Sequence, residues 1–200
     1  MKKKLYIVID AQNDFISGSL GSKKAQEVTP NIAKFLSTVK NKEDTVGIWA
    51  TRDTHFNDEV NNGSPKYKNT LEGQKLPVEH CIYGTIGWEI DRRVMPFIDE
   101  MKIWNKPTFM CHHLGKHLSY ITEATKTLAI DEIVLMGFCT GICVASNAIY
   151  LRGLFPNMKI TVLEDLCACV NEDTHKAALT TMGCCQIDIE NSEEFLKNVL

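Results

Sequence analysis

The sequence contains no apolar run that approaches the roughly 20 residues of a membrane-spanning helix. It also has no strongly basic segment, because its net charge is −3 and its charged side chains are spread along the chain. A nucleic-acid-binding surface needs a concentrated basic face. The opening MKKKLYIVID becomes polar too quickly for a secretory signal. We therefore expect a soluble, cytoplasmic protein that binds neither nucleic acid nor membrane.

No two cysteines have the C-x-x-C spacing of a metal clip or redox motif, although the chain contains eight. In a short exported chain that number would suggest a disulfide framework. Without an export signal we expect mostly free thiols, which are buried like small hydrophobic side chains. Cys139 and Cys143 are close in sequence, and four interpretations stay open for them: a metal clip, a disulfide, core packing, or a nucleophile and its neighbour.

The length of 200 residues is typical of one domain, so we expect residues 1–200 to form a single domain. Six short apolar stretches have the composition of β-strands: residues 5–10, 45–50, 101–105, 132–138, 158–165 and 185–189. Helical spacing of apolar residues occurs between them, at residues 25–40, 118–129, 142–151, 173–182 and 193–200. This alternation predicts an α/β fold: a doubly wound, mainly parallel six-stranded sheet of Rossmann-like topology, with helices on both faces.

Polar residues follow several of the predicted strands. Asp10 ends the first strand, Asp53 and His55 follow the second, Lys106 follows the third and Cys143 follows the fourth. In open α/β sheets, ligands bind beyond the carboxyl ends of the strands. If the first and fourth strands are neighbours, as in the usual doubly wound order, Asp10 lies beside Cys143.

A cysteine, an aspartate and a lysine at one edge of a sheet predict acyl-transfer chemistry without histidine. A nearby lysine and the first turn of a helix both favour the thiolate of Cys143, which is the attacking form. Asp10 could take the thiol proton and return it to a leaving group. Such a site suits the cleavage of an amide or a related C–N bond. Alternatively, Asp10 caps a nearby loop and Lys106 is a solvated surface lysine.

Five segments in the same order resemble one family. They are VIDAQNDF (8–15), TRDTH (51–55), LPVEHCIYGTIGWEI (76–90), GFCTGICV (137–144) and EDLCACVNEDTHKAAL (164–179). Together they resemble the isochorismatase-like cysteine hydrolases and, within them, the nicotinamidases and pyrazinamidases. The resemblance covers nearly the whole chain, and several ordered motifs are far more specific than any single one.

The resemblance implies a catalytic triad of Asp10, Lys106 and Cys143, and a thioester intermediate on Cys143. It also implies a cis peptide bond between Phe138 and Cys139. The backbone N–H groups of Cys139 and Cys143 would then form the oxyanion hole, so that Cys139 contributes its backbone rather than its sulfur. The implied reaction is hydrolysis of a small carboxamide, most specifically nicotinamide to nicotinate and ammonia.

Residues 52–88 contain the candidate metal ligands. This segment is rich in Asn, Gly, Pro and charge, and so long a loop is usually functional or disordered. The resemblance implies a divalent metal held by Asp53, His55 and His80, with Glu72 as a fourth ligand. A mixed carboxylate and imidazole set suits zinc, and also manganese or iron. The alternative is that both histidines are ordinary polar loop residues.

The chain also departs from the nicotinamidase pattern. Pro77 stands where many relatives have Trp, His113 stands where many have another aromatic residue, and Gly141 stands where many have an acidic residue. Phe15 remains as the expected aromatic residue of the substrate pocket, because a ring-shaped substrate needs a stacking surface. Trp88 or His113 could compensate for the missing rings.

These departures keep two other functions open: hydrolysis of ureido, carbamoyl or other small amides, and a non-catalytic binding role on the same fold. His112, His113 and His117 receive no named role. The partner is then a small-molecule amide. We expect a homodimer or a homotetramer, because the sheet has two free edges and such assemblies are common in the family that the chain resembles.

Overall fold

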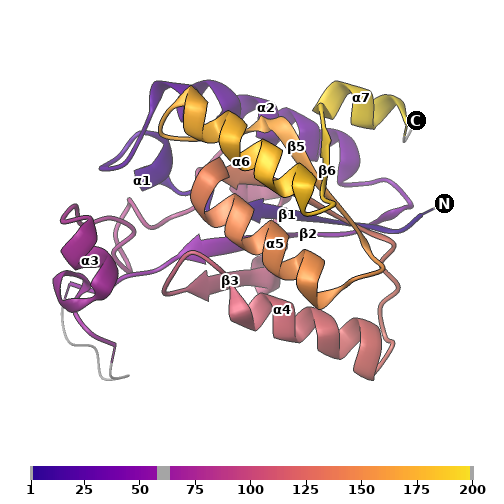
Figure 1. The fold of residues 1–200 in the computed structure, drawn as a ribbon, viewed down its shortest axis with the longest axis horizontal. Helices are drawn as coiled ribbons and strands as arrows, with labels where there is room; N and C mark the ends of the chain where they lie inside the picture. Colours follow the sequence, from indigo (N-terminus) through magenta and orange to yellow (C-terminus); the bar gives the residue numbers. More distant parts are fainter. Residues whose placement is uncertain (1, 58–63, 199–200) are drawn as a thin grey trace.

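The computed structural model describes residues 2–57 and 64–198, which contain a six-stranded parallel sheet (Figure 1). Its strands are β1 (Lys4–Ile9), β2 (Thr45–Asp53), β3 (Ile103–Lys106), β4 (Glu132–Phe138), β5 (Lys159–Ala168) and β6 (Asp188–Glu190). Their order across the sheet is β3-β2-β1-β4-β5-β6, and each neighbouring pair is parallel. The predicted fold class and the adjacency of the first and fourth strands are therefore confirmed.

Helices cover both faces of the sheet. They are α1 (Asn13–Ile16), α2 (Lys23–Val39), α3 (Leu71–Lys75), α4 (His112–Ser119), α5 (Ala145–Leu154), α6 (Glu172–Cys184) and α7 (Ser192–Lys197). Short helical turns occur at Tyr67–Asn69, Met95–Phe97, Glu100–Lys102, Tyr120–Ala124 and Thr140–Val144. Apolar residues of α2 and α7 pack on one face, and those of α4, α5 and α6 pack on the other. None of the helices in the described residues is long and apolar enough to cross a membrane.

The central strand β1 is covered on both faces, which explains why its residues from Leu5 to Ile9 are all apolar. Leu5, Ile7 and Ile9 belong to the core on the α4–α6 side, whereas Tyr6 and Val8 belong to the core on the α2 side. Successive strand residues point to opposite faces, so a strand covered on both sides shows a continuous apolar run. The chain leaves β1 at the edge of the sheet where α1 and α3 lie, opposite the N-terminus (Figure 1).

Several predicted boundaries were wrong. The second strand, expected at 45–50, continues to Asp53, so Asp53 ends this strand rather than following it. The helix expected at 118–129 begins at His112 and gives way to the turn Tyr120–Ala124, and Lys126 then adopts a left-handed φ of 51° that a helix does not allow. The fifth strand continues to Ala168, so Cys167 lies in a buried strand rather than in a loop. The sixth strand begins at Asp188, because the preceding residues form the end of α6 and a turn.

The other helix predictions hold within a few residues. The helix expected at 25–40 is α2, the one at 173–182 is α6, and the one at 142–151 begins as the turn Thr140–Val144 and continues as α5. The helix expected at 193–200 is α7, which ends at Lys197, and residues 199–200 lie outside the described residues. All eight cysteines are free, as expected for most of them, and five are buried.

Candidate active site

The ammonium group of Lys106 lies at the centre of the candidate site. Its Nζ is 2.8 Å from Oδ2 of Asp10, 3.4 Å from Sγ of Cys143 and 3.3 Å from Oδ1 of Asp53. The side chain is almost completely buried. This burial excludes the alternative of a solvated surface lysine. The structure thus brings together the three residues expected to form the triad.

Asp10 occupies a tight turn directly after β1. Its φ is 47°, a left-handed conformation that aspartate tolerates better than most residues, and its carbonyl accepts the N–H of Gln12 at 2.7 Å. The hydroxyl of Thr51 donates to Oδ1 of Asp10 at 2.7 Å, which leaves Oδ2 toward Lys106. The carboxyl group is fully buried. Two strands and one turn therefore hold its orientation.

Cys143 lies in the helical turn Thr140–Val144, which precedes α5. The peptide bond between Phe138 and Cys139 is cis, as the resemblance implied. Gly137 precedes it with a φ of 125°, and a Cβ there would lie 2.0 Å from the carbonyl oxygen of Ile9, so only glycine fits. The carbonyl of Cys139 accepts the N–H groups of two residues of the turn. The cysteine of the turn is thereby held against β1.

Burial and charge set the protonation states of these groups. Burial raises the pKa of the Cys143 thiol well above its usual value, although Lys106 acts in the opposite direction. Burial also raises the pKa of Asp10, again against the effect of Lys106. For Lys106 itself, burial lowers the pKa, but the negative charge of Asp10 and other neighbours raises it well above its usual value. The resting site therefore holds a neutral thiol, whereas the lysine and the helix turn alone would predict a thiolate.

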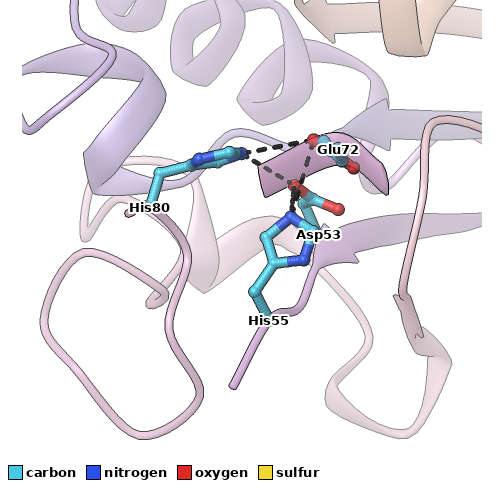
Figure 2. A group of neighbouring side chains, drawn as sticks. All are labelled: Asp53, His55, Glu72 and His80. Atoms are coloured by element: carbon cyan, nitrogen blue, oxygen red, sulfur yellow. Dashed lines mark hydrogen bonds and ion pairs between the residues drawn. The ribbon is translucent and has the colours of Figure 1, made fainter. Parts of the chain in front are cut away.

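Asp53, which contacts Lys106, is one of four side chains that converge in a single cluster (Figure 2). They are Asp53, His55, Glu72 and His80, and one ligand atom from each lies within 4.8 Å of the others. Nε2 of His55 is 3.0 Å from Oδ2 of Asp53, and Nε2 of His80 is 3.6 Å from Oε1 of Glu72. Two imidazole nitrogens and two carboxylates in one cluster form a donor set that suits a divalent metal. Because both histidines are buried and partnered here, they are not solvated loop residues.

Each of these four residues is oriented by its own element. Nδ1 of His80 is 2.8 Å from the carbonyl of Val78, so its Nε2 faces the cluster. Glu72 lies in the first turn of α3, which Thr70 caps through the N–H of Gly73. These contacts hold His80 and Glu72 toward the other members of the cluster.

The charges within the cluster reinforce one another. Burial lowers the pKa of His80, but hydrogen bonds with Asp53 and Glu72 outweigh it and raise the pKa to about 9. Burial acts to raise the pKa of Asp53, yet the charge of Lys106 and hydrogen bonds from both histidines hold it well below its usual range. Asp53 is therefore an ionised carboxylate between the lysine and the histidines.

Of the rings expected to offer a stacking surface near the site, Phe15 and His113 lie beside it, whereas Trp88 is covered. Phe15 is half-buried, and its ring centroid lies 5.6 Å from that of His80, so it borders the cluster. Trp88 is buried beneath the guanidinium of Arg52, 3.4 Å from its ring centroid, and does not supply a free stacking surface. His113 lines a hollow of about 460 Å3 beside Lys106, together with Thr54, Phe56, Ser64, Tyr83, Asn105 and Pro107.

His112 and His117 lie outside the cluster. Nδ1 of His112 is 3.2 Å from the hydroxyl of Tyr150, and Nε2 of His117 is 3.4 Å from Nζ of Lys102. At Gly141, a Cβ would lie 2.9 Å from Cγ2 of Thr174. The turn before Cys143 packs closely on α6 there, which accounts for a glycine in place of an acidic residue.

Sequence reasoning missed three residues that hold the site together. Thr51 orients Asp10, Gln12 binds both backbone groups of Asp53 (Oε1 to N–H at 2.7 Å, Nε2 to the carbonyl at 2.9 Å), and Asn147 binds the carbonyl of Cys143 at 2.8 Å. The only signal was proximity, because Gln12 follows Asp10 closely and Asn147 lies one helical turn beyond Cys143.

Comparison with family models decides the relationship. The model described as the isochorismatase domain matches residues 4–194, which is nearly the whole described chain. The chain belongs to the isochorismatase family of hydrolases. A comparison with curated protein sequences gave no significant match.

Solved structures share the fold of this isochorismatase-family hydrolase. A nicotinamidase/pyrazinamidase from Bacillus subtilis is 22% identical with a TM-score of 0.74, over 94% of this chain and 100% of that chain. A pyrazinamidase from Pyrococcus horikoshii in complex with zinc is 21% identical with a TM-score of 0.69, over 94% and 99%. An N-carbamoylsarcosine amidase from Thermoplasma acidophilum is 22% identical with a TM-score of 0.70, over 95% and 96%. At these identities the likeness establishes the fold alone.

Proposed function

We propose that this isochorismatase-family hydrolase cleaves a small carboxamide through Cys143, with nicotinamide as the first candidate and nicotinate and ammonia as products. One observation carries the proposal: the buried ammonium of Lys106 lies within 3.4 Å of Sγ of Cys143 and 2.8 Å of Oδ2 of Asp10. A structural ion pair would not need the thiol, whereas a nucleophile needs a base and a counter-charge within reach.

The acylation step begins with the neutral thiol. Asp10 takes the proton from Sγ of Cys143 as Sγ attacks the carboxamide carbon, and the raised pKa of Asp10 makes this carboxylate a better base than an ordinary aspartate. Lys106 stays protonated and balances the negative charge as it moves from Asp10 to sulfur. The backbone N–H groups of Cys139 and Cys143 stabilise the oxyanion. When the C–N bond breaks, Asp10 returns its proton to the departing nitrogen, which leaves as ammonia.

Deacylation uses the same groups in reverse. Asp10 takes a proton from water as the water oxygen attacks the thioester carbon. The same two N–H groups hold the second oxyanion, and the C–S bond then breaks. Asp10 returns the proton to the sulfur of Cys143, and the carboxylic acid product leaves. One water molecule is consumed, and the enzyme returns to its starting protonation state.

We propose that Asp53, His55, Glu72 and His80 hold a divalent metal, zinc in the first instance and manganese or iron as alternatives. The donor set fits, because it combines imidazole nitrogens already oriented by second hydrogen bonds with carboxylates. The zinc complex of the P. horikoshii pyrazinamidase supports the choice of zinc. When bound, the ion would supply Lewis acidity next to the substrate or to its hydrolytic water.

A second candidate substrate class is supported by the residues near the site. Pro77 supplies no aromatic ring, and Trp88 is covered by Arg52. The remaining surfaces on which a pyridine could stack are Phe15 and the hollow lined by Phe56, Tyr83 and His113. A smaller ureido or carbamoyl amide needs less stacking surface. The shared fold of the N-carbamoylsarcosine amidase supports this alternative.

The deciding experiment measures ammonia release from nicotinamide, pyrazinamide and N-carbamoylsarcosine by zinc-loaded enzyme, with Cys143→Ala at equal metal content as the control. Preference for nicotinamide supports the first candidate, and preference for the carbamoyl substrate supports the second. If the zinc-loaded enzyme cleaves no amide of this panel, the protein is a binding protein on this fold and the catalytic proposal is wrong.

A further inference from the structure

We propose that Asn147 is a positioning residue, whose side-chain amide holds the segment that follows Lys106 against the helical turn that carries Cys143. The inference rests on the proposed function, since it assigns Asn147 to the same site. In the described structure the side chain of Asn147 bonds to backbone groups and not to Sγ of Cys143 or the carboxyl group of Asp10, so its role is one of geometry.

Every polar atom of the Asn147 side chain is used. Oδ1 accepts the backbone N–H of Cys111 at 2.9 Å, and Nδ2 donates to the carbonyl of Phe109 at 3.0 Å and to the carbonyl of Cys143 at 2.8 Å. The residue is 1% exposed. Buried amides of this kind are satisfied almost without exception. Two of the bonds reach a segment that is distant in sequence, and the third reaches the carbonyl one helical turn earlier.

The two segments joined by Asn147 carry two members of the triad. β3 ends at Lys106, and the following residues pass through Phe109 to Cys111, the residue that precedes α4. At the start of α4, the N–H of Cys111 donates to Oδ1 of Asn147. The third bond reaches the carbonyl of the nucleophile itself. Asn147 therefore joins the backbone next to the lysine to the backbone of the cysteine.

The adjoining helices make this connection rigid. A Cβ at Gly115 of α4 would lie 2.3 Å from the ring of Tyr150 of α5, so the two helices are in close contact next to Asn147. The ring of Tyr150 also reaches His112, at 3.2 Å from hydroxyl to Nδ1. Loss of the Asn147 side-chain amide would release the segment between β3 and α4 at the end nearest the site. The contact between Gly115 and Tyr150 would still keep α4 and α5 packed.

Two substitutions separate geometry from stability. Asn147→Ala removes all three bonds, whereas Asn147→Asp keeps nearly the same shape and the acceptor for Cys111 but cannot donate to two carbonyls when ionised. The matched control is Thr161→Val, which removes a buried hydrogen bond (Thr161 to Glu132, 2.6 Å) at the amino end of β5, far along the strand from the site.

The experiment measures the pH midpoint of Cys143 alkylation by iodoacetamide in the intact, zinc-loaded protein, with peptide fragmentation to distinguish Cys143 from Cys139. The groups that act on this thiol are Lys106, Asp10 and Asp53, and Lys106 is the one that lowers its pKa. Release of Lys106 should move the midpoint upward by about half a pH unit or more in both Asn147 variants. Amide hydrolysis should show kcat lower on the order of tenfold or more, with KM changed much less.

The control defines what would overturn the inference. Thr161→Val should lose stability but keep the wild-type midpoint and kcat. If the Asn147 variants also lose stability but keep the wild-type alkylation midpoint and the wild-type kcat, Asn147 is a structural residue only and the proposal is wrong. If Asn147→Ala does not fold, the kcat and KM of Asn147→Asp decide, because the added carboxylate would by itself raise the midpoint of the thiol. Because alkylation needs no substrate, the midpoint tests Asn147 even if the wild-type protein hydrolyses no amide, so the two proposals can fail separately.

Discussion

Asp53 and Lys106 face each other as register partners on β2 and β3, and Oδ1 of Asp53 lies 3.3 Å from Nζ of Lys106. The other oxygen of the same carboxylate lies 3.0 Å from Nε2 of His55. One side chain therefore contacts the lysine of the candidate triad and also belongs to the candidate metal cluster. A change at Asp53 should affect catalysis through two routes, whereas a change at Glu72 should affect it through the metal alone.

Asp53→Asn is expected to lower kcat by about 100-fold or more even at saturating zinc, because Asn cannot balance the buried charge of Lys106. Glu72→Gln is the matched control, since Glu72 pairs with both histidines whereas, among the described residues, Lys106 pairs with Asp10 and Asp53. Its activity should recover as zinc is raised. The measurement is kcat against zinc concentration with bound metal determined in parallel. Full recovery of Asp53→Asn at high zinc would contradict the bridging role.

Gln12→Leu should weaken zinc binding by about 10- to 100-fold, the usual effect of removing a group that orients a metal ligand. Gln12 binds the N–H and the carbonyl of Asp53 and also donates to the carbonyl of Trp88 at 2.9 Å. Asn13→Ala is the control, because Asn13 donates to the exposed carbonyl of Ile86 instead. A competition titration with a chromophoric chelator measures both affinities. Equal affinities in the two variants would refute the prediction.

Removal of the metal should destabilise the protein, because the clustered carboxylates of Asp53 and Glu72 lose their shared cation. Zinc at 100 times its Kd should add about 2.7 kcal/mol to the free energy of unfolding. For a chain of this size that corresponds to a rise in Tm of about 5–10 °C. The measurement compares thermal unfolding with excess chelator and with zinc, and His55→Ala is the control. A wild-type Tm that is unchanged by chelator and zinc alike would argue against the cluster as a metal site.

The ion pair of Lys4 and Asp44 at the start of β1 predicts a pH dependence of stability away from the site. Burial acts to raise the pKa of Asp44, but the hydrogen bond and charge of Lys4 outweigh it and hold the pKa below its usual value. A depressed folded pKa contributes stability above the unfolded pKa of about 3.9, and that stability is lost as pH falls through the folded pKa.

Asp44→Asn leaves Lys4 buried and charged, so it should cost about 3 kcal/mol at pH 7. The difference from wild type should shrink as pH falls below about 4, because Asp44 of the unfolded chain then takes up a proton, and folded Asp44 follows only at its lower pKa. Urea unfolding of both proteins across this pH range measures it. A difference that stays constant down to pH 3 would show that charge is not the cause.

The central strands could be predicted because both of their faces are buried. The run at 132–138 coincides with β4, since a fully covered strand shows uninterrupted apolar and β-branched residues. β5 was predicted too short because Glu164 and Asp165 interrupt its apolar run, although the strand continues to Ala168. The expected homodimer or homotetramer and the single domain stay predictions.

The residues of the site could be located because they follow strands, but their environment could not. The spacing of Asp10, Lys106 and Cys143 predicted their convergence, whereas the burial that keeps the thiol neutral depends on how the strands and helices pack. Gln12 and Asn147 bind backbone groups of distant segments. No local pattern encodes such partners, because tertiary approach alone selects them.

The central claim is that Cys143 is the nucleophile of an amidohydrolase. The most direct test measures ammonia release from nicotinamide and the carbamoyl substrate by wild-type and Cys143→Ala proteins of equal fold and equal zinc content. The account predicts turnover by the wild-type enzyme with at least one of them and none above background by Cys143→Ala. Turnover near the wild-type rate by Cys143→Ala would contradict it.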